Sequence, residues 1–115
     1  MSLRSVYRIT VFIPPDSVPA LQSALQKTGA LSYGNYSDVL WLSSPGKESF
    51  MPLPGSTPTL GTEGEATTSS SVQVVFSVAR EEAVLASVID AIRSAHPWEE
   101  PVVYVDETLA LSSRS

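Results

Sequence analysis

The strongest constraint on the fold is an order of elements that occurs twice along the chain. Apolar and polar residues alternate over 6–14 and again over 71–79, and this period of two is typical of a half-buried β-strand. Each strand leads into a stretch with apolar residues at helical spacing, 14–29 in the first half and 80–95 in the second. The chain therefore repeats a strand–helix order.

Each predicted helix leads to a further strand, at 36–43 and at 101–107. Two strand–helix–strand units interleave into a four-stranded antiparallel sheet with both helices on one face. The sequence thus predicts an α+β, ferredoxin-like βαββαβ fold. A short extra strand or arm at 47–54 is expected to pair back on 36–43, because "SPGK" between them is a turn signal.

A chain of 115 residues fits one domain, 1–115, with a folded part at about 5–109. Gly, Pro, Ser and Thr dominate the stretch from 52 to 71, and no apolar periodicity marks it as a core element. Such a composition predicts a long flexible loop, at about 54–70, after the second strand.

Charge and composition exclude several function classes. The net charge is −5, and the seven Lys and Arg residues are spread along the chain, so a phosphate-binding surface for nucleic acid or an anionic membrane is not expected. The chain has no cysteine, which excludes disulfides and thiolate zinc sites. It has no long apolar run and no signal-peptide pattern, so we expect a soluble, cytoplasmic protein.

The alternation also predicts which residues face the core and how the helices end. In the first strand, Tyr7 and Ile9 begin a core-facing row that continues two residues at a time to Ile13. Asp16 is the expected N-cap of the first helix, and Gly29 its expected end.

The sheet face without helices should carry Phe12 and Val75. The last strand should add either Val102 and Tyr104 or Val103 and Val105. A mixed polar and apolar face of this kind suits contact with another subunit, so a homo-oligomer is expected.

The segment "AHPWEEP" holds the only histidine, His96, together with Glu99 and Glu100. One interpretation is structural: Pro97 ends the helix, Trp98 fills the end of the core, and the carboxylates accept local hydrogen bonds. The alternative is a divalent-metal site ligated by His96, Glu99 and Glu100, although three or four ligands are normally needed. A general acid–base role is a third possibility.

The segment "GNYS" follows the first helix. Gly34, Asn35, Tyr36 and Ser37 either stop the helix and enter the next strand, or line a pocket for an anion or small ligand. "GxxxxGN" lacks the lysine of a P-loop, so phosphate binding is poorly supported.

Taken in order, four segments resemble one known domain. They are 7–30, "YGNYSDVLW", 50–64 and 88–107, and together they are similar to the insert domain of the Nif-three-like family of the YqfO type. The resemblance implies a fold like those of CutA and the PII signalling proteins, which are ferredoxin-like and trimeric. In larger family members a separate domain carries the metal ligands, so the resemblance does not transfer an activity to this chain.

The resemblance therefore implies a small oligomeric module that binds a ligand, a metal ion or a protein partner without catalysis. A trimer is favoured and a dimer comes next. Gly34, Asn35, Tyr36, Ser37, His96, Glu99 and Glu100 are the candidate ligand-binding residues, expected to meet in space because both motifs stand at helix-to-strand junctions. The alternatives are a CutA-like protein that binds divalent metal ions and an enzyme that uses His96 with Glu99 or Glu100. No cofactor is firmly implied beyond a possible divalent ion.

Overall fold

The computed structural model describes residues 2–112. Along the chain the elements are β1 (Leu3–Ile13), the short 3-10 helix η1 (Pro15–Ser17), α1 (Val18–Thr28), β2 (Trp41–Leu42), β3 (Gly46–Phe50), β4 (Thr67–Ala79), α2 (Glu82–Ala95) and β5 (Val102–Leu111).

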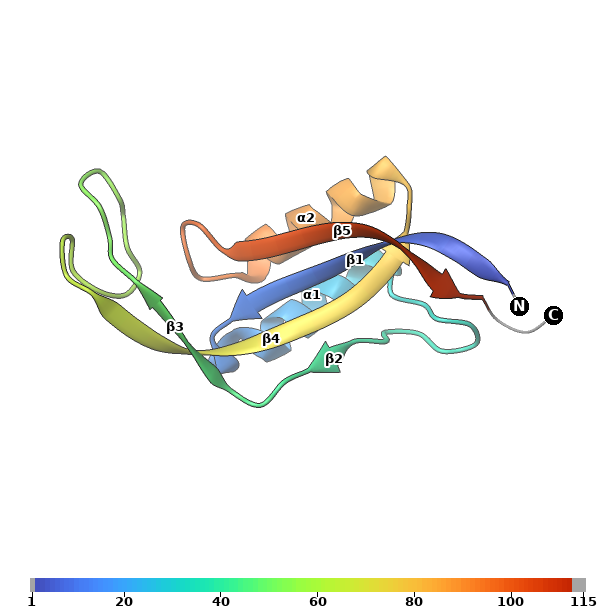
Figure 1. The fold of residues 1–115 in the computed structure, drawn as a ribbon, viewed down its shortest axis with the longest axis horizontal. Helices are drawn as coiled ribbons and strands as arrows, with labels where there is room; N and C mark the ends of the chain where they lie inside the picture. Colours follow the sequence, from blue (N-terminus) through green and yellow to red (C-terminus); the bar gives the residue numbers. More distant parts are fainter. Residues whose placement is uncertain (1, 113–115) are drawn as a thin grey trace.

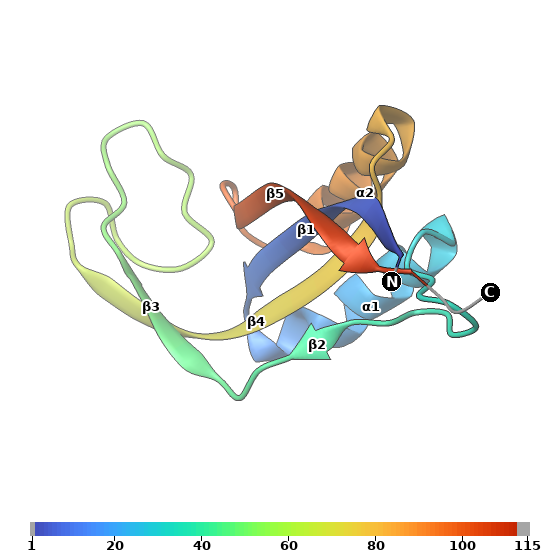
Figure 2. The same cartoon turned by 45° about the vertical axis from the view of Figure 1, so that its right-hand side comes forward.

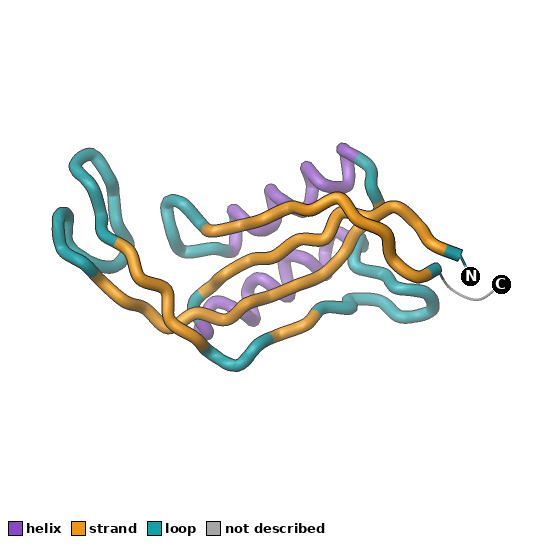
Figure 3. The backbone as a smooth tube through the Cα atoms, in the orientation of Figure 1, coloured by secondary structure: helices purple, strands orange, loops and turns teal. Residues whose placement is uncertain are grey.

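The strands form one antiparallel sheet in the order β2-β4-β1-β5, and β3 pairs separately with β4 (Figure 1; Figure 3). The two helices lie side by side on one face of this sheet, as both ribbon views show (Figure 2). The predicted ferredoxin-like α+β fold, with a four-stranded sheet and an extra short strand, is confirmed.

The core lies between the sheet and the helices, and its members follow from the two periodicities. Every second residue of β1 from Ile9 and of β4 from Val72 is buried, because alternate side chains of a strand share one face. The helices add one apolar stripe each. The fully buried side chains shared by these elements include Ile9, Val11, Ile13, Leu21, Leu25, Val74, Val78, Val88 and Ile92.

The start of α1 differs from the prediction. Asp16 lies inside η1, and Ser17 occupies the N-cap position without a side-chain hydrogen bond. The prolines explain this, because Pro14 and Pro15 fix a tight turn before the helix can begin. The predicted end is confirmed: Gly29 caps α1 with a left-handed backbone, φ 65°.

The second predicted strand is much shorter than 36–43, since β2 contains only Trp41 and Leu42. A tight turn before it explains the loss: Tyr33 and Tyr36 exchange backbone hydrogen bonds of 2.7 and 3.1 Å. Asp38 then takes a positive φ of 58°, which no extended strand contains.

The predicted pairing of the arm with the second strand is wrong. Trp41 and Leu42 pair with Val75 and Val74, and β3 pairs with the preceding part of β4, from Gly46 opposite Ser71 to Phe50 opposite Thr67. β2 and β3 therefore run in the same direction along one long partner, and "SPGK" is a bend rather than a reversal.

The pairing of β3 with β4 also corrects the predicted bounds of the flexible loop. Residues 67–70 were expected in a flexible loop of 54–70, but they belong to β4 and pair with β3. The β3–β4 arm extends beyond the helices and gives the molecule its length of 55 Å (Figure 1). In residues 2–112, neither helix is long and apolar enough to cross a membrane.

Candidate functional site

His96 stands where α2 ends, and it is buried. Pro97 forces an extended backbone on His96, with φ −81° and ψ 131°, so the helix stops there. The ring Nε2 lies 2.7 Å from the carbonyl oxygen of Phe12, and the backbone N–H of Trp98 donates to Nδ1 over 3.2 Å. Two backbone groups thus hold the imidazole at the end of β1.

These two hydrogen bonds define the charge of the ring. Nδ1 accepts, so in the neutral tautomer Nε2 carries the hydrogen and donates it to Phe12. Burial lowers the pKa of His96, while the Phe12 carbonyl and the nearby Glu48 carboxylate partly oppose that shift. A neutral imidazole with both nitrogens occupied can take up a metal ion or a proton only by breaking one of these contacts.

The structure does not gather the three predicted metal ligands into one set. No group of three or more His, Asp or Glu residues within 2–112 is arranged to hold a metal ion. Glu99 is engaged elsewhere. Its carboxylate accepts hydrogen bonds from the backbone N–H of Thr57, at 2.8 and 3.1 Å, and from the Thr57 hydroxyl, at 3.1 Å.

The loop between β3 and β4 is docked on the "HPWEE" segment rather than free of it. Besides the Thr57–Glu99 contact, the Thr59 hydroxyl donates to the carbonyl oxygen of Pro97 over 2.8 Å. Within the loop, the Gly64 N–H donates to the carbonyl of Pro52 over 2.7 Å, and Pro52 is buried. The loop therefore forms one wall of a site whose other wall is the turn after α2.

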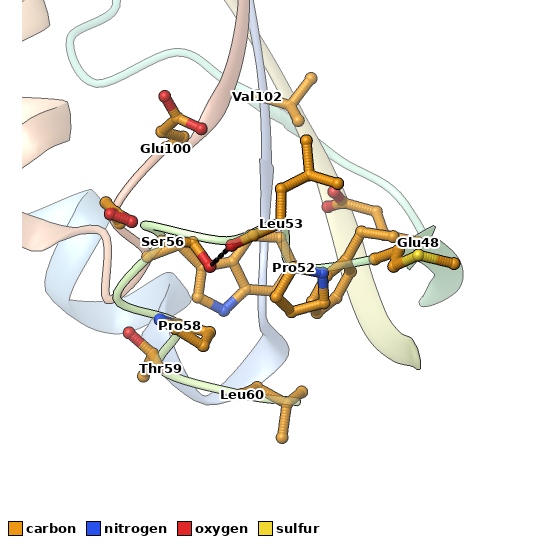
Figure 4. A pocket seen from close by; sticks show the side chains of 13 residues that line it. Glu48, Pro52, Leu53, Ser56, Pro58, Thr59, Leu60, Glu100 and Val102 are labelled. Atoms are coloured by element: carbon orange, nitrogen blue, oxygen red, sulfur yellow. Dashed lines mark hydrogen bonds between the residues drawn. The ribbon is translucent and has the colours of Figure 1, made fainter. Parts of the chain in front are cut away.

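A pocket of about 270 Å³ lies between these two walls (Figure 4). Its floor is aromatic: the ring centroid of Trp98 is 5.7 Å from that of Phe50 and 5.3 Å from that of His96. Further apolar walls come from the loop. The residues that contribute them are Met51, Pro52, Leu53, Pro58 and Leu60.

Three carboxylates border this Trp98 pocket, those of Glu48, Glu99 and Glu100, and no lysine or arginine lines it. Glu48 accepts a hydrogen bond of 2.5 Å from the hydroxyl of Ser71. In Figure 4, Glu100 lies at the upper left of the pocket, Val102 at the upper right and Glu48 at the right. The pocket thus combines apolar walls with a negative border.

The other predicted motif lies away from this pocket. Gly34, Asn35, Tyr36 and Ser37 are all exposed, and Gly34 takes a φ of 59° in the turn closed by Tyr33 and Tyr36. Tyr33 lies at the start of β1, where the guanidinium carbon of Arg4 is 4.9 Å from its ring centroid. His96 contacts Phe12, at the end of β1.

The expectation that the two motifs meet is therefore wrong, and the topology explains it. β1 and β4 are antiparallel, and each helix runs back along the strand before it. The two helices thus end at opposite ends of the sheet, so the turns that follow them are far apart (Figure 1).

Sequence reasoning missed the loop residues that complete the site. Thr57, Leu53 and Leu60 carry no local signal of a pocket, and the Thr57–Glu99 contact joins residues 42 positions apart. The available signal was the resemblance, which covered both 50–64 and 88–107 without indicating that they touch.

The strands and helices define an α+β domain with a ferredoxin-like fold, and the docked loop adds an aromatic pocket to it. Its structure is similar to CutA1 from Oryza sativa, with TM-score 0.63 and 11% identity over 91% of this chain and 81% of that chain. It is also similar to GlnK of B. subtilis, with TM-score 0.58 and 15% identity over 90% of this chain and 85% of that one. At these identities the likeness concerns the fold.

Sequence relatives are more specific. The chain is 34% identical over 103 residues to the GTP cyclohydrolase 1 type 2 homolog of Mycobacterium leprae, covering 88% of this chain and 26% of that protein. A Bacillus cereus protein related to NIF3 gives a TM-score of 0.75 at 25% identity, over 94% of this chain and 27% of that one. The predicted resemblance to the Nif-three-like family is confirmed.

The chain spans about a quarter of the length of these relatives. No family model matches the sequence.

Proposed function

We propose that this chain is a self-associating binding module: copies associate through the open face of the sheet, and the Trp98 pocket takes a small ligand. The observation that carries self-association is the row of largely apolar side chains on the sheet face opposite the helices. Since paired residues of neighbouring strands point to the same side, the register of the strands identifies the members of this row.

The row crosses all four strands. Trp41 pairs with Val75, Val75 with Thr10, and Thr10 with Tyr104. Phe12 packs edge-on against Tyr104, with ring centroids 6.5 Å apart. Trp41 and Tyr104 are 58% and 59% exposed, which is unusual for aromatic side chains in a single domain.

Covering such a face removes apolar area from water, and each Å² contributes about 25 cal/mol. Stable interfaces between proteins usually bury more than roughly 1,000 Å². A trimer is the favoured state on the resemblance to CutA and PII proteins, and a dimer is next. The acidic and basic pair Arg8 and Asp106, 3.7 Å apart on the same face, would give the interface a polar border.

Light scattering and sedimentation at micromolar concentration test this proposal. The expected mass is a multiple of 12.3 kDa. Tyr104→Lys should shift the chain toward monomer, because it places a charge in the apolar row. Leu109→Lys is the matched control, since Leu109 lies on the same strand, is also 59% exposed, and by alternation points to the opposite face. A wild-type monomer throughout that range would overturn the proposal.

The ligand-binding part of the proposal assigns distinct roles to the predicted site residues. His96 and Glu99 position the walls of the Trp98 pocket through their backbone and loop contacts, and Glu100 faces the ligand. The turn of Gly34, Asn35, Tyr36 and Ser37 has no part in the pocket. A divalent ion at His96, Glu99 and Glu100, or acid–base catalysis by them, would require His96 to release a hydrogen bond, which favours binding without catalysis.

The activity named in the relatives belongs to proteins of which this chain matches about a quarter, and the proposal does not extend it to this chain.

A further inference from the structure

We infer that the ligand of the Trp98 pocket is an organic cation, a small molecule in which an apolar or aromatic group carries an ammonium group. This inference rests on the proposed ligand-binding function, and it names the chemical class that the pocket selects. Three observations carry it: the size of the cavity, the aromatic floor and the charge of the border.

The size suits a small organic molecule. At about 270 Å³ the cavity is near the lower end of the range for small-molecule sites, and its walls come from separate parts of the chain. Phe50 belongs to β3, Leu53 and Leu60 to the loop, and Trp98 to the turn after α2. A cavity of this size can hold an apolar group of about the size of a benzene ring.

The aromatic floor favours a cation over a neutral group. Indole is the side chain that attracts a cation most strongly over its face, and Trp98 is only partly buried, so part of its surface is open to a ligand. The neighbouring Phe50 and His96 rings, at 5.7 and 5.3 Å between centroids, fix the indole in place. The ligand therefore meets a preorganised aromatic surface.

The charge of the border points the same way. Glu48, Glu99 and Glu100 contribute negative charge at the pocket, and no basic residue lines it to compensate. Glu48 and Glu99 already accept hydrogen bonds from Ser71 and Thr57. Within residues 2–112, Glu100 makes no hydrogen bond or ion pair, so its carboxylate is available to an ammonium group.

The same charges argue against the other occupants. An anionic ligand would be repelled by all three carboxylates. A second copy of this chain carries a net charge of −5, so its approach to an acidic border is also opposed. A neutral aromatic molecule would use the walls but leave the carboxylates without a partner.

Three probes of matched shape test the inference: 2-phenylethylamine, 2-phenylethanol and 3-phenylpropionate. Titration calorimetry on the wild-type chain should give heat for the amine, a weaker response for the alcohol and none for the acid. The affinity for the amine should fall as salt rises, because salt screens the carboxylates.

The two tryptophans allow the binding to be located. In a Trp41→Phe chain the fluorescence comes from Trp98, and it should change on addition of the amine. Glu100→Gln should weaken amine binding about two- to fivefold, as expected for an exposed ion pair. Asp90→Asn makes the same change in net charge on the exposed side of α2 and should leave the affinity unchanged. Leu53→Ala removes an exposed apolar wall without touching the core, and it should weaken all binding.

Equal binding of the three probes, or no binding of the amine, would overturn the inference. A chain that self-associates but ignores the amine refutes only the ligand class. A monomer that binds the amine refutes only the assembly through the open sheet face.

Discussion

The helix-covered body and the Trp98 pocket are held together in different ways. In the body, aliphatic side chains from the sheet and both helices bury one another, and Ile9, Leu21 and Ile92 are no more than 1% exposed. At the pocket, a few polar contacts join distant parts of the chain: Thr57 with Glu99, Thr59 with Pro97, and His96 with Phe12.

The difference has a physical consequence. Close packing is cooperative, so the body should unfold as a unit, whereas a loop held by a few exposed hydrogen bonds can open by itself at much lower free energy. A ligand pocket on the less stable region can change shape without disturbing the sheet. Substitutions in the body should therefore lower the stability of the whole chain, whereas substitutions at the pocket should have smaller effects confined to the loop.

The largest effect is expected in the body. Ile92→Ala should lower the free energy of unfolding by about 2–5 kcal/mol, because it leaves a cavity between α2 and the sheet. Urea denaturation measures it. Ile89→Ala on the same helix is the matched control, since Ile89 is only partly buried and should cost less. Equal losses of unfolding free energy at the two positions would mean that the burial of the side chain does not determine how much stability is lost.

The next effect is expected inside the loop, at Gly61. Its φ is 91°, and a Cβ there would lie 2.8 Å from the hydroxyl oxygen of Thr67, so Gly61→Ala combines backbone strain with a clash. The strain alone costs about 1–2 kcal/mol. Amide exchange in the loop should rise while the unfolding of the body changes less.

Gly64→Ala is the control for this effect. Gly64 has a φ of 80°, but a Cβ there would meet no atom within 4 Å, so only the strain is added. The comparison would be broken if the two alanine variants had the same loop exchange, because the docking of the loop on Thr67 would then contribute nothing.

The body was predictable because its signals are local and periodic. Alternation identified the buried faces of β1 and β4, and helical spacing identified α2. The prediction failed where a strand carries no apolar residues. Thr67–Ser70 extend β4 into the arm, where one side is exposed and the polar side chains of the other are only partly buried, so no apolar alternation separated them from a loop.

The pocket was only partly predictable. The end of α2 at His96 was correctly expected, because a proline after the histidine forces the helix to stop. Trp98 was expected to fill the end of the core, but it is only partly buried and lines the pocket beside Phe50. The partner of Glu99 could not be found, since Thr57 lies 42 residues away in a segment without periodicity. The separation of the two motifs, however, follows from the antiparallel order of β1 and β4 and could have been derived.

A smaller effect is expected at the contact that docks the loop. Glu99→Gln replaces a carboxylate that accepts three hydrogen bonds from Thr57 with an amide that accepts through one oxygen. The loss should be about 0.5–1.5 kcal/mol of local stability, measured as faster amide exchange at Thr57. Glu100→Gln is the neighbouring control and should leave that exchange rate as it is. A matching increase in both variants would show that net charge, not the Thr57 contact, sets the rate.

The smallest effect is a dependence of stability on pH through His96. Burial lowers the pKa of His96 in the folded chain below its usual value of about 6.5. Above that value the imidazole is neutral in both the folded and the unfolded chain, and its hydrogen bonds contribute in full. As the pH falls below it, the unfolded chain binds the proton first, so stability is lost toward the folded pKa.

Replacing the ring isolates this loss from the carboxylates, which also titrate in acid. His96→Gln keeps a side-chain donor and acceptor near Phe12 and Trp98 but cannot be protonated. Urea denaturation of both chains between about pH 7.5 and pH 5 should show a steeper decline for the wild type, since only it carries the buried imidazole. Parallel declines would mean that His96 takes up a proton equally well in the folded and the unfolded chain. The polar contacts at the pocket would then not favour the neutral form of His96. The pocket and the body would differ only in how closely their side chains pack.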